Sequence, residues 1–139
     1  MKEDVLAWWA RALDTLHAAE LLVSASPDNA ASRAYYAAHH ALSAHFLLAG
    51  AAYIKHSALE AAVHRELVRP GIWTIELGKN YSELVRLRGH GDYGGTIRVL
   101  ETEAREAVQK ARRILCAVQR MHPDIFIPED TKREEQHGA

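Results

Sequence analysis

The segment from residue 96 to residue 120, TIRVLETEAREAVQKARRILCAVQR, carries the most regular apolar pattern in the chain. Apolar side chains recur along it at intervals of three or four residues: Ile97, Leu100, Ala104, Ala107, Ala111, Ile114 and Val118. Because residues with this spacing return to one face of an α-helix, the segment predicts a long amphipathic helix with one buried stripe. Such spacing is typical of helices packed in a left-handed bundle.

Four more helical segments precede this one. Apolar residues at similar intervals predict long helices over residues 3–24 and 27–49, and shorter helices over 57–69 and from residue 74 onward. Because the connections between them are short, neighbouring helices should run antiparallel. We therefore expect an all-α fold, an antiparallel up-and-down bundle of four to five helices.

Local signals indicate where these helices begin and end. Gly50 can take the left-handed conformation that ends the second helix, and Thr74 can cap the fourth. Ser57 and Glu60 have the spacing of a capping box, which predicts that the third helix starts at Ser57. Four glycines between residues 89 and 95 are incompatible with a stable helix interior, so this run predicts a turn or a frayed helix end.

The chain has 139 residues and 48% hydrophobic content, which suits one core. We expect one helical-bundle domain over residues 1–121 and a C-terminal tail over residues 122–139 that is partly mobile. Three adjacent hydrophobic residues of the tail, Ile125, Phe126 and Ile127, can dock on the bundle or on a partner. No apolar run approaches the ~18 residues of a membrane span, and no signal-peptide pattern opens the chain. We therefore expect a cytoplasmic protein that does not bind membranes.

The net charge of −1 gives no overall basic field for a nucleic acid. Positive charge is nevertheless concentrated over residues 86–98, where Arg86, Arg88 and Arg98 outweigh Asp92. An anion-binding site is therefore expected in this part of the chain.

Cysteine and histidine patterns argue against a metal site. The single cysteine, Cys116, cannot form an internal disulfide, and we expect it to lie buried on the apolar stripe of the last helix. The chain has nine histidines, but no H-E-x-x-H or carboxylate triad accompanies them. We expect no metal and no cofactor.

Three short motifs follow one another along the chain. They are S-R-A-Y-Y-A at residues 32–37, His56-Ser57, and R-G-H-G-D-Y at residues 88–93. Together they resemble the HEPN family, in the branch whose members have S-R-x-Y-Y-A early, H-S in the middle and R-x-x-x-D-Y before the last long helix. The resemblance covers roughly residues 4–120 and implies the helical bundle that the periodicity predicts independently.

The resemblance also implies a function and a site. HEPN ribonucleases use an arginine and a histidine for metal-independent RNA cleavage, in which a 2′-hydroxyl attacks the adjacent phosphate. The arginine stabilises phosphoryl charge and the histidine moves protons. We accordingly take Arg88, His90 and Asp92 as candidate catalytic residues, and Arg33, Arg88 and Tyr93 as candidates for binding the phosphate of RNA or a nucleotide.

This sequence departs from the ribonuclease motif at one position. It has Asp92 where a histidine is expected, and an aspartate with an ordinary pKa of ~3.9 is a poor acid at pH 7. Either His90 substitutes, a second subunit completes the site, or the activity is weak or absent. Arg33 and His39 do have the R-x(4–6)-H spacing of these ribonucleases. Because they lie in the second helix rather than at the start of the last one, we interpret that match as accidental.

Two functional classes are open. The first is a candidate RNA endonuclease, similar to the toxin of a prokaryotic toxin–antitoxin or defence pair. The alternative is a non-catalytic nucleotide- or substrate-binding partner of a minimal nucleotidyltransferase, and a purely structural dimerisation module is a third hypothesis. The resemblance implies a homodimer with Arg88 and Asp92 near its two-fold axis. It also implies that a nucleotidyltransferase antitoxin could transfer AMP to Tyr93.

Overall fold

A computed structural model describes residues 2–93 and 95–128, with the side chains of residues 91–93 excepted. These residues form five α-helices, a single π-helical turn and no strand, which confirms the predicted all-α bundle. The elements are α1 (Lys2–Leu22), α2 (Pro27–Leu48), α3 (His56–Val63), the π-helical turn η1 (His64–Val68), α4 (Ile75–Tyr93) and α5 (Glu101–Met121). None of the described helices is long and apolar enough to cross a membrane.

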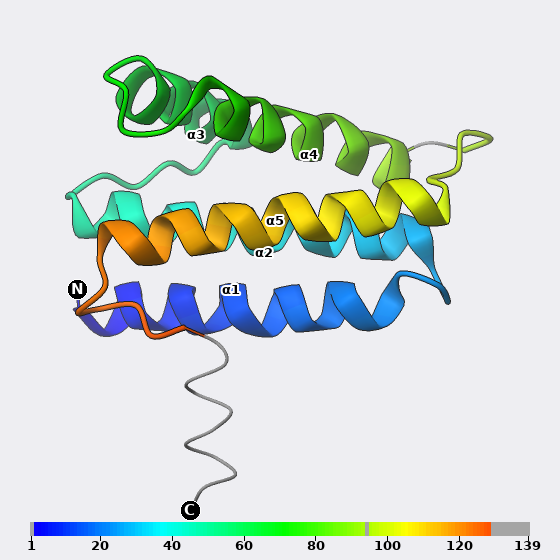
Figure 1. The fold of residues 1–139 in the computed structure, drawn as a ribbon, viewed down its shortest axis with the longest axis horizontal. Helices are drawn as coiled ribbons and strands as arrows, with labels where there is room; N and C mark the ends of the chain where they lie inside the picture. The colour runs from blue at the N-terminus through cyan, green and yellow to red at the C-terminus, as the bar shows by residue number, and fades with distance from the viewer. Residues whose placement is uncertain (1, 94, 129–139) are drawn as a thin grey trace, which may run out of the picture.

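Helix α2 is the central element of the bundle. It packs against α1, α4 and α5, and the long helices alternate in direction along the chain (Figure 1). Two aromatic residues of α2, Tyr35 and Phe46, are almost completely buried, as is Leu42. Most of the other buried positions of α2 are alanines, whose small side chains let the neighbouring helices approach closely. The core therefore surrounds α2.

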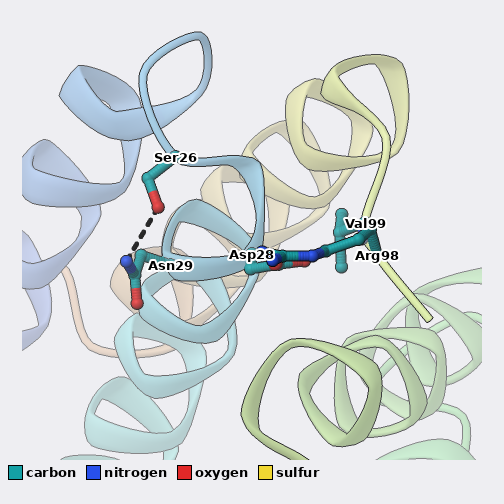
Figure 2. A network of polar contacts seen from close by, with 5 residues as sticks. All are labelled: Ser26, Asp28, Asn29, Arg98 and Val99. Carbon is teal, nitrogen blue, oxygen red and sulfur yellow. Dashed lines mark hydrogen bonds and ion pairs between the residues drawn. The ribbon is translucent and has the colours of Figure 1, made fainter. Parts of the chain in front are cut away.

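The start of the last helix differs from the prediction. Helix α5 begins at Glu101 rather than Thr96, and Ile97 and Leu100 are 55% and 63% exposed, so their assignment to the buried stripe was wrong. The cause is Asp28, near the start of α2 (Figure 2). Its carboxylate accepts a hydrogen bond from the Val99 amide at 2.7 Å and forms an ion pair with Arg98 at 3.0 Å. These two contacts hold the pKa of Asp28 below its usual value and fix the segment before α5 to α2.

The structure also settles where α3 begins and where α4 ends. Helix α3 begins at His56, so Ser57 lies inside the helix and no side-chain cap is formed there. Helix α4 continues past Gly89 and Gly91 and ends at Tyr93, and Gly95 lies in a turn with a φ of +55°, so the glycine-rich run contains the predicted helix end. Two end signals are confirmed: Gly50 has a φ of +88°, and the Leu77 amide donates a hydrogen bond to Thr74 Oγ1 at 3.1 Å.

The prediction that Cys116 is buried was also wrong. Its side chain is exposed, because the buried face of α5 runs through Ile114, Leu115 and Val118. Cys116 lies two residues after Ile114, which turns it about 200° around the helix axis. The only cysteine of the chain is therefore accessible at the surface.

The C-terminal segment docks on α1, as expected for its hydrophobic residues. Phe126 is fully buried, and its ring stacks on that of Trp9 with 4.7 Å between centroids. The Trp9 indole N–H donates a hydrogen bond to the carbonyl of Ile127 at 3.0 Å. His122 adds a contact to α2, since its Nε2 lies 2.8 Å from Nδ1 of His45. Figure 1 shows this segment turning back along α1.

A close approach between η1 and α4 depends on Gly78. A Cβ atom at this position would lie only 2.6 Å from Cγ2 of Val68. Gly89, in the same helix, has open space around it, because a Cβ atom there would meet nothing within 4 Å. The two glycines thus have opposite structural roles in α4.

We predict opposite effects of alanine at these two positions. Gly78→Ala should lower the free energy of unfolding by about 1–3 kcal/mol, because Val68 or the helix must shift. Gly89→Ala should raise it by up to about 1 kcal/mol, because alanine has the higher helix propensity. Urea denaturation at pH 7.5 measures both. A destabilised Gly89→Ala variant would contradict the helical conformation of residue 89.

Candidate functional site

The candidate site is built around Arg88, on α4, where it meets two tyrosines of α2. The Arg88 guanidinium carbon lies 5.1 Å from the Tyr35 ring centroid and 5.9 Å from that of Tyr36. Arg88 Nη1 also donates a hydrogen bond to the Tyr36 hydroxyl at 3.2 Å. Cation–π contacts of this kind hold a guanidinium in place without neutralising its charge. Arg88 therefore lies positioned on an aromatic support while still carrying its positive charge.

Two histidines meet at the hydroxyl of Tyr35. This hydroxyl forms a short hydrogen bond with Nδ1 of His56, at the start of α3, and a longer one of 3.4 Å with Nδ1 of His39, on α2. The two imidazole rings stack, with 4.6 Å between centroids and 10° between planes. If Tyr35 donates to His56, its oxygen can accept from His39, which leaves a proton on Nε2 of His56 and a free lone pair on Nε2 of His39. The pair then presents one donor and one acceptor.

Burial and mutual repulsion keep these groups uncharged near neutral pH. Burial, followed by the neighbouring His56, His40 and Arg88, lowers the pKa of His39 to about 4. The pKa of His56 is also lowered, first by burial and then by Arg88. Burial raises the pKa of Tyr35 to about 12. At pH 7 the Arg88 guanidinium therefore lies near neutral imidazoles and a neutral phenol.

A row of cations and aromatic rings continues from this site across α2 to α1. The Arg33 guanidinium lies 5.5 Å from the Tyr36 ring centroid. The Tyr36 ring lies 6.0 Å from His40, whose ring lies 5.2 Å from Trp8, and Trp8 in turn carries Arg11 at 5.3 Å. Rings that alternate with guanidinium groups are suited to stacking with bases and contacting phosphates of a single strand.

The structure brings together some of the residues predicted from sequence. Arg33, from α2, and Arg88, from α4, both contact Tyr36, so the structure brings these two candidate residues together. His90 is half-buried but makes no hydrogen bond, ion pair or ring contact with the described residues. Because it lies two residues after Arg88 on a helix, it projects from a different side of α4. The side chains of Asp92 and Tyr93 lie outside the described residues. The roles of these three residues remain predictions.

Sequence reasoning missed the histidines of the site. His56 is part of a quoted motif and His39 has the R-x(4–6)-H spacing from Arg33, but the sequence analysis gives neither a role and interprets that spacing as accidental. One signal was available: His39 follows Tyr35 by four residues, which places both on one face of α2. Nothing in the sequence, by contrast, places His56 beside them, because that depends on how α3 returns over α2.

A metal centre has no support among the described residues, which contain no group of three or more histidine, cysteine or acidic side chains able to hold an ion. The Nδ1 atoms of His39 and His56 are already directed at Tyr35. The arrangement can instead bind a phosphate at Arg88 and transfer protons at the two imidazoles.

The protein is thus an all-helical bundle with a cluster of arginine, tyrosine and histidine side chains where α2, α3 and α4 meet. A family model of the HEPN domain matches residues 5–121, so the chain belongs to the HEPN domain family. It is also similar to a UPF0332 protein of Thermotoga maritima, with 34% identity over 126 residues, which cover 89% of this chain and 96% of that protein. The family resemblance seen in the sequence is thus confirmed.

We predict a loss of stability at mildly acidic pH. Burial lowers the pKa of His39, His40 and His45 from the ordinary 6.5 to about 4 in the folded protein. Between these two values the unfolded chain binds more protons than the folded one, so protonation favours unfolding. The three neutral histidines therefore make their full contribution to the free energy of unfolding above pH 6.5, and this free energy falls as the pH drops toward 4. Urea denaturation at pH 7.5 and pH 5 should show the loss, and His39→Asn should reduce it. An equal loss in the variant would contradict the low pKa of His39.

Proposed function

We propose that this protein is a metal-independent RNA endonuclease, similar to the toxin of a prokaryotic toxin–antitoxin or defence pair. The observation that carries the proposal is the placement of Arg88 beside the histidine pair. The guanidinium lies against Tyr35 and Tyr36 and remains cationic. Its charge helps to lower the pKa of His39 and His56, so both imidazoles stay neutral at pH 7. RNA cleavage by an internal 2′-hydroxyl requires these two elements, a fixed cation for the phosphoryl oxygens and groups that exchange protons.

The hydrogen bonds of the cluster suggest how the protons move. The 2′-oxygen forms a bond to phosphorus, the bond from phosphorus to the 5′-oxygen breaks, and a 2′,3′-cyclic phosphate results. Nε2 of His39 accepts the proton of the 2′-hydroxyl, and Nε2 of His56 donates one to the leaving 5′-oxygen. Tyr35 connects the two rings through their Nδ1 atoms, so a proton passed along this chain returns both rings to the neutral form with donor and acceptor exchanged, and proton exchange with water at the two Nε2 atoms restores the starting tautomers. Arg88 stabilises the negative charge on the phosphoryl oxygens.

A set of single variants tests this proposal. Arg88→Ala should reduce kcat/KM for a single-stranded RNA by about 100- to 1,000-fold, the usual loss when one charge-stabilising donor is removed. Arg86→Ala is the matched control, because Arg86 is an exposed arginine on the same helix that faces away from Tyr35. Cleavage should persist in EDTA.

The same assay identifies the proton carrier. If His56 donates the proton, His56→Gln should lose most of the activity and His90→Gln should retain it, and the reverse result would assign the role to His90. A preparation that cleaves no RNA, or that EDTA inhibits, would contradict the endonuclease proposal.

The second candidate function is a non-catalytic nucleotide-binding partner of a minimal nucleotidyltransferase. One observation favours it: His39 has a pKa of about 4 and is therefore a weak base at pH 7. Its Nδ1 is already engaged in a hydrogen bond with the Tyr35 hydroxyl, which is a structural role. Such a cluster could serve only to hold Arg88 for a phosphate. In that case Arg88→Ala would weaken nucleotide binding, and no RNA would be cut. In either case AMP transferred to Tyr93 would bring a phosphate near Arg88 and block the site.

We further propose that the working form is a homodimer. Among the described residues, eight large hydrophobic side chains are exposed: Leu6, Leu21, Ile54, Ile72, Ile75, Ile97, Leu100 and Ile127. An isologous two-fold contact would cover part of this surface in both copies at once.

Light scattering at micromolar concentration tests the dimer. We expect a mass of twice the 15.5 kDa of the chain. A charged residue placed at an exposed hydrophobic position of the contact, such as Ile97→Glu or Ile75→Glu, should shift the mass toward that of one chain. A wild-type mass of 15.5 kDa would contradict the dimer.

A further inference from the structure

A second cationic groove lies away from Arg88, between the first turns of α4 and the C-terminal half of α5. Its volume is about 630 Å³. Thr74 and Asn80 line it from the side of α4, and Arg113, Cys116 and Arg120 line it from α5. Neither the family resemblance nor the proposed RNA site uses these residues.

The charge of the groove is positive. Arg113 and Arg120 are exposed, and neither forms an ion pair with the described residues. They are seven residues apart on α5, which places them on the same face about two turns apart. A third arginine, Arg112, is paired with Glu20 at 2.5 Å, and the one acidic residue of the lining is Glu76. Two guanidinium groups are thus available to an anion.

Asn80 is the independent sign of a ligand. Its side chain is 3% exposed and lines the groove, yet it has no hydrogen-bond partner among the described residues. The Asn80 amide is not among the polar atoms that are fully enclosed without a partner, so it opens to the groove, where water or a ligand completes its hydrogen bonds. The Asn80 amide can donate to an anion that the two arginines attract. The N-terminal end of the 19-residue helix α4, at Thr74 and Glu76, adds the positive end of a helix dipole to the same groove.

We propose that this groove binds a phosphate group, with Arg113, Arg120 and Asn80 as its ligands. The phosphate can belong to an RNA strand or to a free nucleotide, since both present the same chemistry. Asn80 lies eight residues before Arg88 on α4, about 12 Å along the axis and about 80° around it. The groove is therefore a site separate from the Arg88 cluster, and the proposal does not depend on RNA cleavage.

Cys116 supplies a direct reporter. It is exposed in the groove and is the only cysteine in the chain, so alkylation by iodoacetamide reports on the surroundings of this one side chain. The probes are inorganic phosphate, AMP, adenosine, and a 2′-O-methyl RNA oligomer, which lacks the 2′-hydroxyl needed for cleavage. We expect AMP or the oligomer, but not adenosine, to slow alkylation at saturation. Protection by the oligomer alone would identify a strand as the ligand, and equal protection by AMP would identify a free nucleotide.

Variants assign the effect to the groove. Arg113→Gln combined with Arg120→Gln should weaken protection at least about tenfold, since each guanidinium makes a charge-assisted hydrogen bond. Asn80→Asp should weaken it as well, by placing a negative charge beside the phosphate. Arg105→Gln is the matched control, an arginine of α5 that pairs with Glu101 outside the groove. Circular dichroism verifies that each variant is folded.

Three results would overturn the proposal. The first is the absence of protection by any phosphate-bearing probe. The second is equal protection by adenosine, which has no phosphate. The third is unchanged protection in a folded variant that lacks both arginines, since Cys116 also borders a smaller apolar cavity beside Trp9 and Leu13.

Discussion

The buried hydroxyl of Tyr35 is the constraint on which the rest of the site depends. Tyr35 is 0% exposed in the middle of the central helix, so its O–H must find partners inside the protein. It finds them in His39 and His56, which fixes the start of α3 over α2. Its ring in turn supports Arg88 from α4. One buried phenol thus links three helices and determines where the cation of the site stands.

The same burial determines the electrostatic character of the site. Histidines at the surface would be partly charged near neutral pH, and each additional positive charge would compete with Arg88 for an anion. Burial and the proximity of Arg88 lower the pKa of His39 and His56 instead. The positive charge of the site is therefore carried by guanidinium groups, while the imidazole nitrogens beside Arg88 stay neutral. This separation of charge from proton exchange is what makes both phosphate binding and phosphodiester cleavage reasonable functions for one cluster.

The sequence predicted the helices well because their apolar periodicity is a local property, and it identified Arg88 and Arg33 through motif resemblance. The sequence analysis was wrong, or silent, where contacts between distant segments determine the conformation of a residue. Ile97 and Leu100 continue the helical pattern, but Asp28, some seventy positions earlier, holds that segment out of the helix. His56 acquires its partners only when α3 folds back over α2. The groove between α4 and α5 had no sequence signal at all, because Asn80, Arg113 and Arg120 form no motif and meet only through helix packing.

The stacking of Phe126 on Trp9 joins the two ends of the bundle, and this has a consequence for the order of events during synthesis. The ribosome completes α1 early, but the residue that covers its indole is made 117 positions later. At typical elongation rates of about 5–20 residues per second, this interval is on the order of ten seconds. Throughout that time the face of Trp9 that Phe126 covers in the folded protein has no partner from the C-terminal segment. Until then this face of the indole is open to other apolar surfaces, including those of a second unfinished chain.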